Sequence, residues 1–96
     1  MATSLDIAAK AVGAALAVSG VGVHLTNANS STPTIDPANA FTRNFSDFNT
    51  SLDIFRASLV NNLPATIAQD IQGLPFDGGT SIQLVVDTVA TLLDAI

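Results

Sequence analysis

A stripe of aromatic and aliphatic residues between positions 41 and 59 constrains the fold of this chain more than any other feature. Its members are Phe41, Phe45, Phe48, Leu52, Phe55 and Leu59. The steps between them run four, three, four, three and four residues, which places all six on one face of a helix. The stripe therefore predicts a long helix with one apolar face that has to be buried.

The pattern leaves open whether an ordinary core, another subunit or lipid buries this face. A chain of 96 residues buries only about 60 to 68% of its unfolded surface on folding, so its own core is marginal. Charged residues are 11% of the chain and hydrophobic residues 48%, with a mean hydropathy of +0.47. This composition favours a subunit or lipid interface, and we expect a homo-oligomer with the stripe as its seam.

The segment from residue 4 to about residue 25 is predicted to form the first helix, because Thr3 and Asp6 have the spacing of a helix start and no proline follows. Its interior is apolar on every side. Gly13 and Gly20 keep it thin enough for another backbone to approach, so they join the predicted oligomer interface. A length of 19 residues, from 7 to 25, is near the roughly 20 that span a bilayer core. A membrane span and a buried central helix are both open interpretations.

Residues 26–35 are rich in Ser, Thr and Asn and are predicted to be a linker. Asp36 suits an N-cap and Pro37 the first helical position, so the second helix is predicted over residues 36–61. On its solvated side, we expect Arg43 to pair with Asp47 and Arg56 with Asp53.

Pro64 predicts a break and a short third helix over residues 64–73, with Gly73 suited to a left-handed C-terminal cap. Thr80 or Ser81 can cap a fourth helix over residues 80–95. Its apolar face would consist of Ile82, Val85, Val86, Val89, Leu93 and Ile96. The chain is therefore expected to be all-α, with three to four helices in a single domain spanning residues 1–96.

All eight acidic residues are aspartates and only three residues are basic, which gives a net charge of -5. Nucleic acid is therefore an unsuitable partner, because its phosphates require a basic patch. Asp87 and Asp94 share one side of the fourth helix at a seven-residue spacing. If the protein forms a pore, these two carboxylates are the candidate lining residues and would favour cations.

No constellation of residues in the sequence matches a catalytic or metal-binding motif. His24 is the only histidine and there is no cysteine, which excludes multi-histidine and cysteine-based zinc sites. A lone histidine near a helix end is more often a cap or an interfacial residue than a catalyst. We therefore predict a protein without enzymatic activity, cofactor or metal, and the sequence specifies no small-molecule ligand.

Several stretches give the chain a resemblance to a known family. The segments "FTRNFSDFNTSLDIF", "NLPATIAQDI" and "TVATLLDAI", in a short acidic chain with amphipathic helices, resemble the small α-helical channel-forming proteins of the corynebacterial and mycobacterial outer membrane. The resemblance implies an oligomeric, cation-preferring pore in a mycolic-acid membrane. The Gly- and Ala-rich first segment departs from that family and is similar to coat subunits of membrane-containing or filamentous viruses and to pilus subunits.

The sequence thus predicts a non-enzymatic, self-assembling helical protein that contacts membrane lipid, with an oligomeric cation-preferring pore as its leading use. The predicted location is a membrane or the cell envelope, and the resemblance indicates an outer membrane. The alternative is a structural coat or filament subunit of a virion or pilus-like assembly, which would be extracellular or part of a virion.

Overall fold

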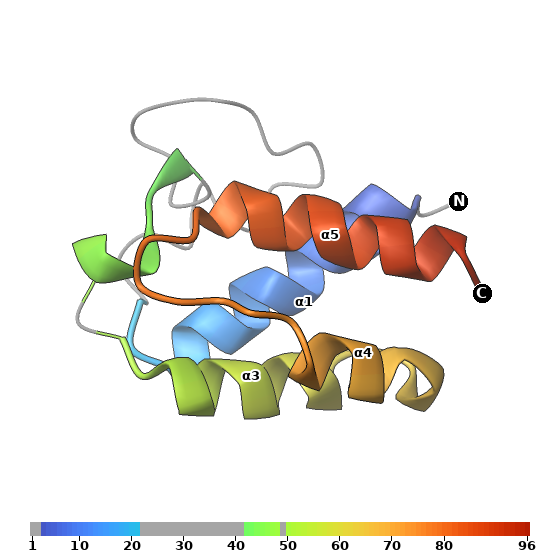
Figure 1. Ribbon diagram of the computed structural model, residues 1–96, viewed down its shortest axis with the longest axis horizontal. Helices are drawn as coiled ribbons and strands as arrows, with labels where there is room; N and C mark the ends of the chain where they lie inside the picture. The colour runs from blue at the N-terminus through green and yellow to red at the C-terminus, as the bar shows by residue number, and fades with distance from the viewer. Residues whose placement is uncertain (1–2, 22–41, 49) are drawn as a thin grey trace.

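The computed structural model describes residues 3–21, 42–48 and 50–96 (Figure 1). These residues confirm the all-α class, since the extended pairing among them is one isolated bridge between Asn44 and Ser81. The predicted linker, residues 26–35, lies outside the described residues.

Helix α1 (Ser4–Val18) starts where the sequence predicts. The backbone amide of Asp6 donates to the Thr3 hydroxyl over 3.1 Å, and the amide of Thr3 donates to the Asp6 carboxylate over 3.3 Å. This reciprocal capping box satisfies two amides that a helix start leaves without an intrahelical partner.

The end of α1 corrects the predicted boundary at residue 25, because the helix stops at Val18. Gly20 has a φ of 108°, and its amide donates to Ala17 while the amide of Val21 donates to Leu16. These two bonds form a Schellman motif, which closes a helix through a left-handed residue. Gly20 is therefore a helix terminator, and only glycine adopts this conformation at low cost.

The second predicted helix, residues 36–61, is also corrected. Its part before residue 42 lies outside the described residues, and the remainder divides into a short 3-10 helix, η3 (Phe45–Asp47), and α3 (Leu52–Asn61). Phe48 is extended between them, and the Ser51 hydroxyl caps α3 by accepting from the amide of Ile54. The apolar spacing continues across this break, so periodicity alone did not reveal it.

The C-terminal half follows the predicted break at Pro64. It contains η4 (Ala65–Ile67), α4 (Ala68–Gln72) and α5 (Ile82–Asp94), and Ser81 caps α5 through the amide of Leu84. Gly73 ends α4 in the right-handed region, so the predicted left-handed cap at this residue is wrong.

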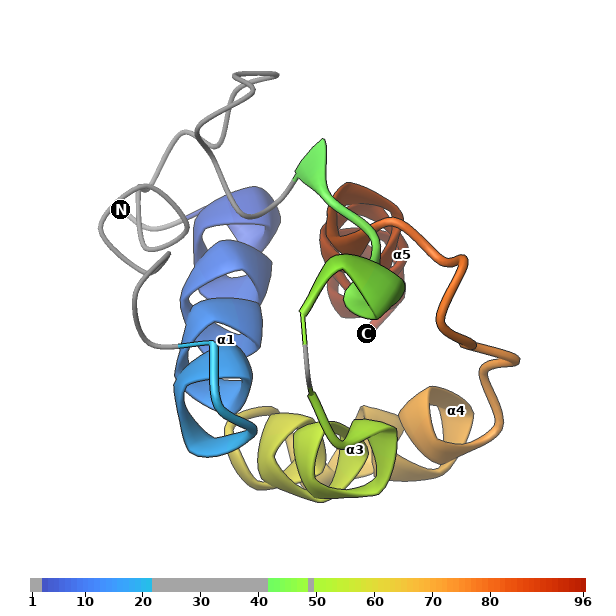
Figure 2. The same cartoon turned by 90° about the vertical axis from the view of Figure 1, so that its left-hand side faces the viewer.

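Helix α1 packs against both α5 and α3 (Figure 1), and Figure 2 shows α1 beside α5 with α3 below them. Its buried side is made mostly of alanines, which allow the neighbouring helices to approach closely. Larger side chains from the other elements complete the core, among them Phe45, Phe55, Leu59, Ile67, Ile71, Ile82, Val85, Val86 and Val89. Each large apolar side chain removed from water contributes about 1.5 to 3 kcal/mol. Within the described residues, no helix is long and apolar enough to cross a membrane.

Candidate functional site

The six stripe residues do not share one environment. Phe45, Phe55 and Leu59 are buried within a single chain. The rings of Phe45 and Phe55 pack edge to face, with their centroids 4.8 Å apart. Phe48 and Leu52 are half-buried against the same core, whereas Phe41 lies outside the described residues. The ordinary-core alternative thus accounts for the three buried members. A seam between chains stays a prediction, and among the described members Phe48 and Leu52 are the ones that remain partly exposed.

The two glycines predicted at the oligomer interface lie in different surroundings. Gly13 is buried within the chain's own helix packing, and Gly20 is exposed just after α1. The structure therefore gives both residues a role inside one chain, in close packing and in helix termination.

The candidate pore-lining residues Asp87 and Asp94 are both exposed on α5. Asp87 accepts a hydrogen bond from the Gln83 side-chain amide at 3.1 Å, and Asp94 accepts one from the Ser4 hydroxyl. The seven-residue spacing does place both carboxylates on the outer side of α5. Their position along a conducting path stays a prediction.

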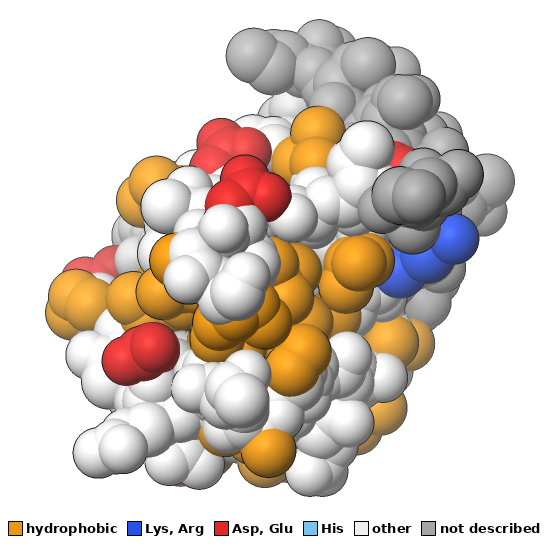
Figure 3. Space-filling view, turned by 90° about the vertical axis from the view of Figure 1, so that its right-hand side faces the viewer, with side chains coloured by type: hydrophobic (Ala, Val, Ile, Leu, Met, Phe, Trp, Pro, Cys, Tyr) orange, Lys and Arg blue, Asp and Glu red, His pale blue; other side chains and the backbone are white. Residues whose placement is uncertain are grey.

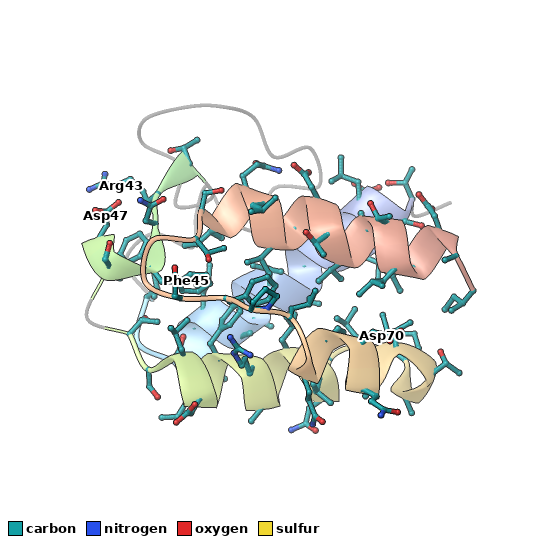
Figure 4. All side chains as sticks on the ribbon, in the orientation of Figure 1. Arg43, Phe45, Asp47 and Asp70 are labelled. Carbon is teal, nitrogen blue, oxygen red and sulfur yellow. The ribbon has the colours of Figure 1, made fainter. Side chains whose placement is uncertain are left out.

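One end of α5 is fastened by backbone hydrogen bonds that the sequence did not indicate. The amide of Ser46 donates to Gly78 over 2.8 Å, and the amide of Ile82 donates to Arg43 over 2.9 Å. We call residues 42–48 and 77–82 together the hydrogen-bonded end. The predicted ion pair between Arg43 and Asp47 lies there, with Arg43 Nε 3.6 Å from Asp47 Oδ2 (Figure 4).

The sequence predicted an ion pair between Arg56 and Asp53. In the structure the Arg56 guanidinium binds backbone carbonyls instead. It donates to Gln72, Leu74 and Phe76 over 3.4, 2.9 and 2.6 Å, and its carbon Cζ lies 5.4 Å from the centre of the Phe76 ring. This side chain joins α3 to the connection between α4 and α5. It also satisfies a carbonyl that the end of α4 leaves without an intrahelical partner.

Two apolar surfaces remain exposed on α1 and α5. The first, which we call the outer face of α1, consists of Ile7, Lys10, Ala14, Ala17 and Val18. Ile7, Lys10, Ala14 and Ala17 follow one another at intervals of three, four and three residues on the exposed side of α1, and Val18 lies next to Ala17.

The second surface, which we call the apolar end, consists of Leu5 and Ile96, 38% and 67% exposed, together with Leu63 and Leu93, which belong to the core and are each 9% exposed. It lies where α1 begins and α5 ends, opposite the hydrogen-bonded end. Figure 3 shows hydrophobic side chains gathered on this side of the molecule, with acidic side chains around them.

In the described part of the chain, the structure contains neither a cavity nor a group of side chains arranged to hold a metal ion. The exposed apolar surfaces are therefore the candidate functional sites, and both would act by contact with another molecule.

Comparison of the chain with protein-family models, with curated proteins and with solved structures finds no match. The resemblance to channel-forming proteins accordingly stays a prediction.

Proposed function

We propose that the protein is a non-enzymatic helical subunit that associates with copies of itself through the outer face of α1. The observation that carries this proposal is the exposure of Ile7 and Val18 at the two ends of a face that has alanines between them. When a second helix covers large apolar side chains on the surface of a helix, the removal of these side chains from water stabilises the pair.

The charges favour the same face for contacts between identical chains. Copies of a chain with a net charge of -5 repel one another, so the favoured contact brings the fewest carboxylates together. Helix α1 carries one acidic residue, Asp6 in its first turn, and one basic residue, Lys10. Helices α4 and α5 carry aspartates and no basic residue.

The size of the face sets the expected strength of this contact. A helix of 15 residues is about 22 Å long, so one helix pair buries less than the roughly 800 Å² per partner of a standard interface. Ala14 and Ala17 permit close approach and partly offset the small area. We expect weak pairing of two chains, which becomes effective in a larger array.

A cation-preferring pore in a membrane is the use that we propose for such an array, with the cell envelope as its location. The excess of aspartates, including the exposed Asp87 and Asp94, supports cation preference. The second candidate is a structural coat or filament subunit, which the Gly- and Ala-rich character of α1 favours.

The proposed contact is tested by sedimentation velocity over a range of protein concentrations. The variant replaces Ile7 and Val18, 40% and 64% exposed, by serine. The matched control replaces Ile54 and Leu84, 48% and 55% exposed on α3 and α5, by serine. We expect the parent and the control to form larger species as concentration rises, and the α1 variant to remain smaller. A parent that stays monomeric, or a control that loses association equally, would disprove the proposal.

Planar-bilayer recordings distinguish the two uses. A pore should give discrete, cation-selective conductance steps, and replacement of Asp87 and Asp94 by asparagine should reduce the selectivity. A coat or filament subunit should give no steps, and electron microscopy of the same sample should show ordered assemblies.

A further inference from the structure

At the apolar end, the apolar patterns of α1 and α5 extend beyond the residues that the core buries. Leu5 lies on the same side of α1 as the buried Val12 and Leu16, but it is exposed. Ile96 lies just beyond the end of α5, whose Val89 and Leu93 are buried, and is exposed as well. At this end the helices therefore present side chains of core type to solvent.

Contacts between the elements bring these side chains together. The Ser4 hydroxyl donates to the Asp94 carboxylate, which fixes the start of α1 beside the end of α5. Leu5 follows Ser4 in the chain, and Leu93 precedes Asp94. Leu63, between α3 and η4, belongs to the buried core and is 9% exposed.

Carboxylates surround this apolar centre. Asp6 lies in the first turn of α1 and Asp94 is the last residue of α5, where the two helices meet. Asp70 is exposed on α4, and Figure 4 shows it on the side of α4 that faces α5. In Figure 3 the acidic side chains lie close around the hydrophobic ones, whereas basic side chains appear only at the margin.

We propose that the apolar end binds a cationic, amphipathic segment of a different protein. Leucine- or isoleucine-type side chains of that segment would cover the exposed Leu5 and Ile96, while its Lys or Arg residues meet Asp6, Asp70 and Asp94. Such charge complementarity accelerates encounter and selects the partner.

The same charges disfavour other occupants of the apolar end. A second copy docked end to end would bring the carboxylates of both chains together, and anionic lipid headgroups would be repelled for the same reason. The apolar end therefore differs from the outer face of α1, a helix in which Asp6 is the one acidic residue.

The test uses two synthetic helical peptides with identical leucine faces, one flanked by lysines and the other by glutamates. Binding to the ¹⁵N-labelled chain is followed by NMR chemical-shift changes. We expect the lysine peptide to shift the amides of Leu5, Leu63, Leu93 and Ile96 in preference to the rest of the chain. The glutamate peptide should cause no such shifts. Raising the salt concentration should weaken the binding of the lysine peptide, because salt screens exposed charges.

Replacement of both Asp70 and Asp94 by asparagine should weaken binding of the lysine peptide several-fold, since exposed ion pairs each contribute modestly. The control replaces Asp53 and Asp87 by asparagine, which changes the net charge equally at other sites and should leave the affinity near that of the parent. Circular dichroism verifies that each variant folds.

Equal binding of both peptides, shifts centred on another surface, or equal losses in the two double variants would overturn the proposal. It would also be overturned if the same amides shifted on dilution of the protein alone or with phosphatidylcholine vesicles, but not with the lysine peptide. Those outcomes would assign the apolar end to a second copy or to lipid. Each is independent of whether the outer face of α1 mediates self-association.

Discussion

The two ends of α5 differ in how they are held to the rest of the small core. At the hydrogen-bonded end, residues 42–48 lie against the start of α5, and their backbone groups are paired with residues 78–82. At the apolar end, a side-chain hydrogen bond from Ser4 to Asp94 joins α1 to α5, and the side chains of Leu5 and Ile96 are exposed to solvent.

The difference shows where a chain of this size completes its own fold and where it leaves surface for others. Backbone pairing at one end fixes the segment that precedes α3 and carries Phe45, whose ring contacts that of Phe55. The other end lacks a comparable covering segment among the described residues. We therefore expect substitutions at the hydrogen-bonded end to change stability, and substitutions at the apolar end to change binding.

The largest effect is expected for Phe55→Ala. Phe55 is completely buried, so truncation should lower the free energy of unfolding by about 3 to 5 kcal/mol. Urea denaturation followed by circular dichroism measures this loss. Phe48→Ala is the matched control, because removal of the half-buried Phe48 ring should lower the free energy of unfolding clearly less. Equal losses at the two positions would contradict the described difference in burial.

A smaller effect is expected when the Arg56 guanidinium is removed. Arg56→Met keeps much of the aliphatic stem but loses the bonds to three carbonyls, and should destabilise the fold by about 1 to 3 kcal/mol. Arg56→Lys retains the charge and should restore part of the loss. If Arg56→Met unfolds at the same urea concentration as the parent, the connection between α4 and α5 does not depend on this side chain.

Gly20→Ala tests the termination of α1. A residue with a Cβ at a φ of 108° is strained, so we expect a loss of about 1 to 2 kcal/mol. The thermal unfolding midpoint should fall accordingly. Ala17→Gly is an informative companion, because it lowers helix propensity by about 1 kcal/mol at an exposed position without affecting the left-handed residue. An unchanged midpoint for Gly20→Ala would show that α1 does not end in this conformation.

The smallest change in stability is expected for Leu5→Ser at the apolar end. Leu5 is exposed, so the free energy of unfolding should stay within about 0.5 kcal/mol of the parent. Binding of the lysine peptide should nevertheless weaken. A loss of stability comparable to that of Phe55→Ala would mean that this end belongs to the chain's own core.

Local signals in the sequence predicted the all-α class and several helix starts. Thr3 with Asp6, and Ser81 before α5, are caps whose partners lie within three residues, so the sequence contains both donor and acceptor. The apolar face of α5 was predicted for the same reason, and Val85, Val86 and Val89 are buried as expected.

Features that depend on distant residues were not predicted. The stripe has helical spacing through Phe48, but hydrogen bonds from Ser46 and Ile82 to partners more than thirty positions away divide it into two elements. Arg56 likewise has Asp53 nearby in sequence, yet it binds carbonyls that chain folding brings to it. The apolar end was missed because Leu5 and Ile96 belong to periodic patterns that resemble core positions.

Amide hydrogen exchange tests the contrast between the two ends most directly. The amides of Ser46 and Ile82 bond outside any regular helix, so their protection reports whether residues 42–48 are fastened to the start of α5. We predict that both exchange almost as slowly as core amides of α1, whereas the amides of Ala95 and Ile96 at the apolar end exchange orders of magnitude faster. Rapid exchange at Ser46 and Ile82, similar to that at Ala95 and Ile96, would contradict the account.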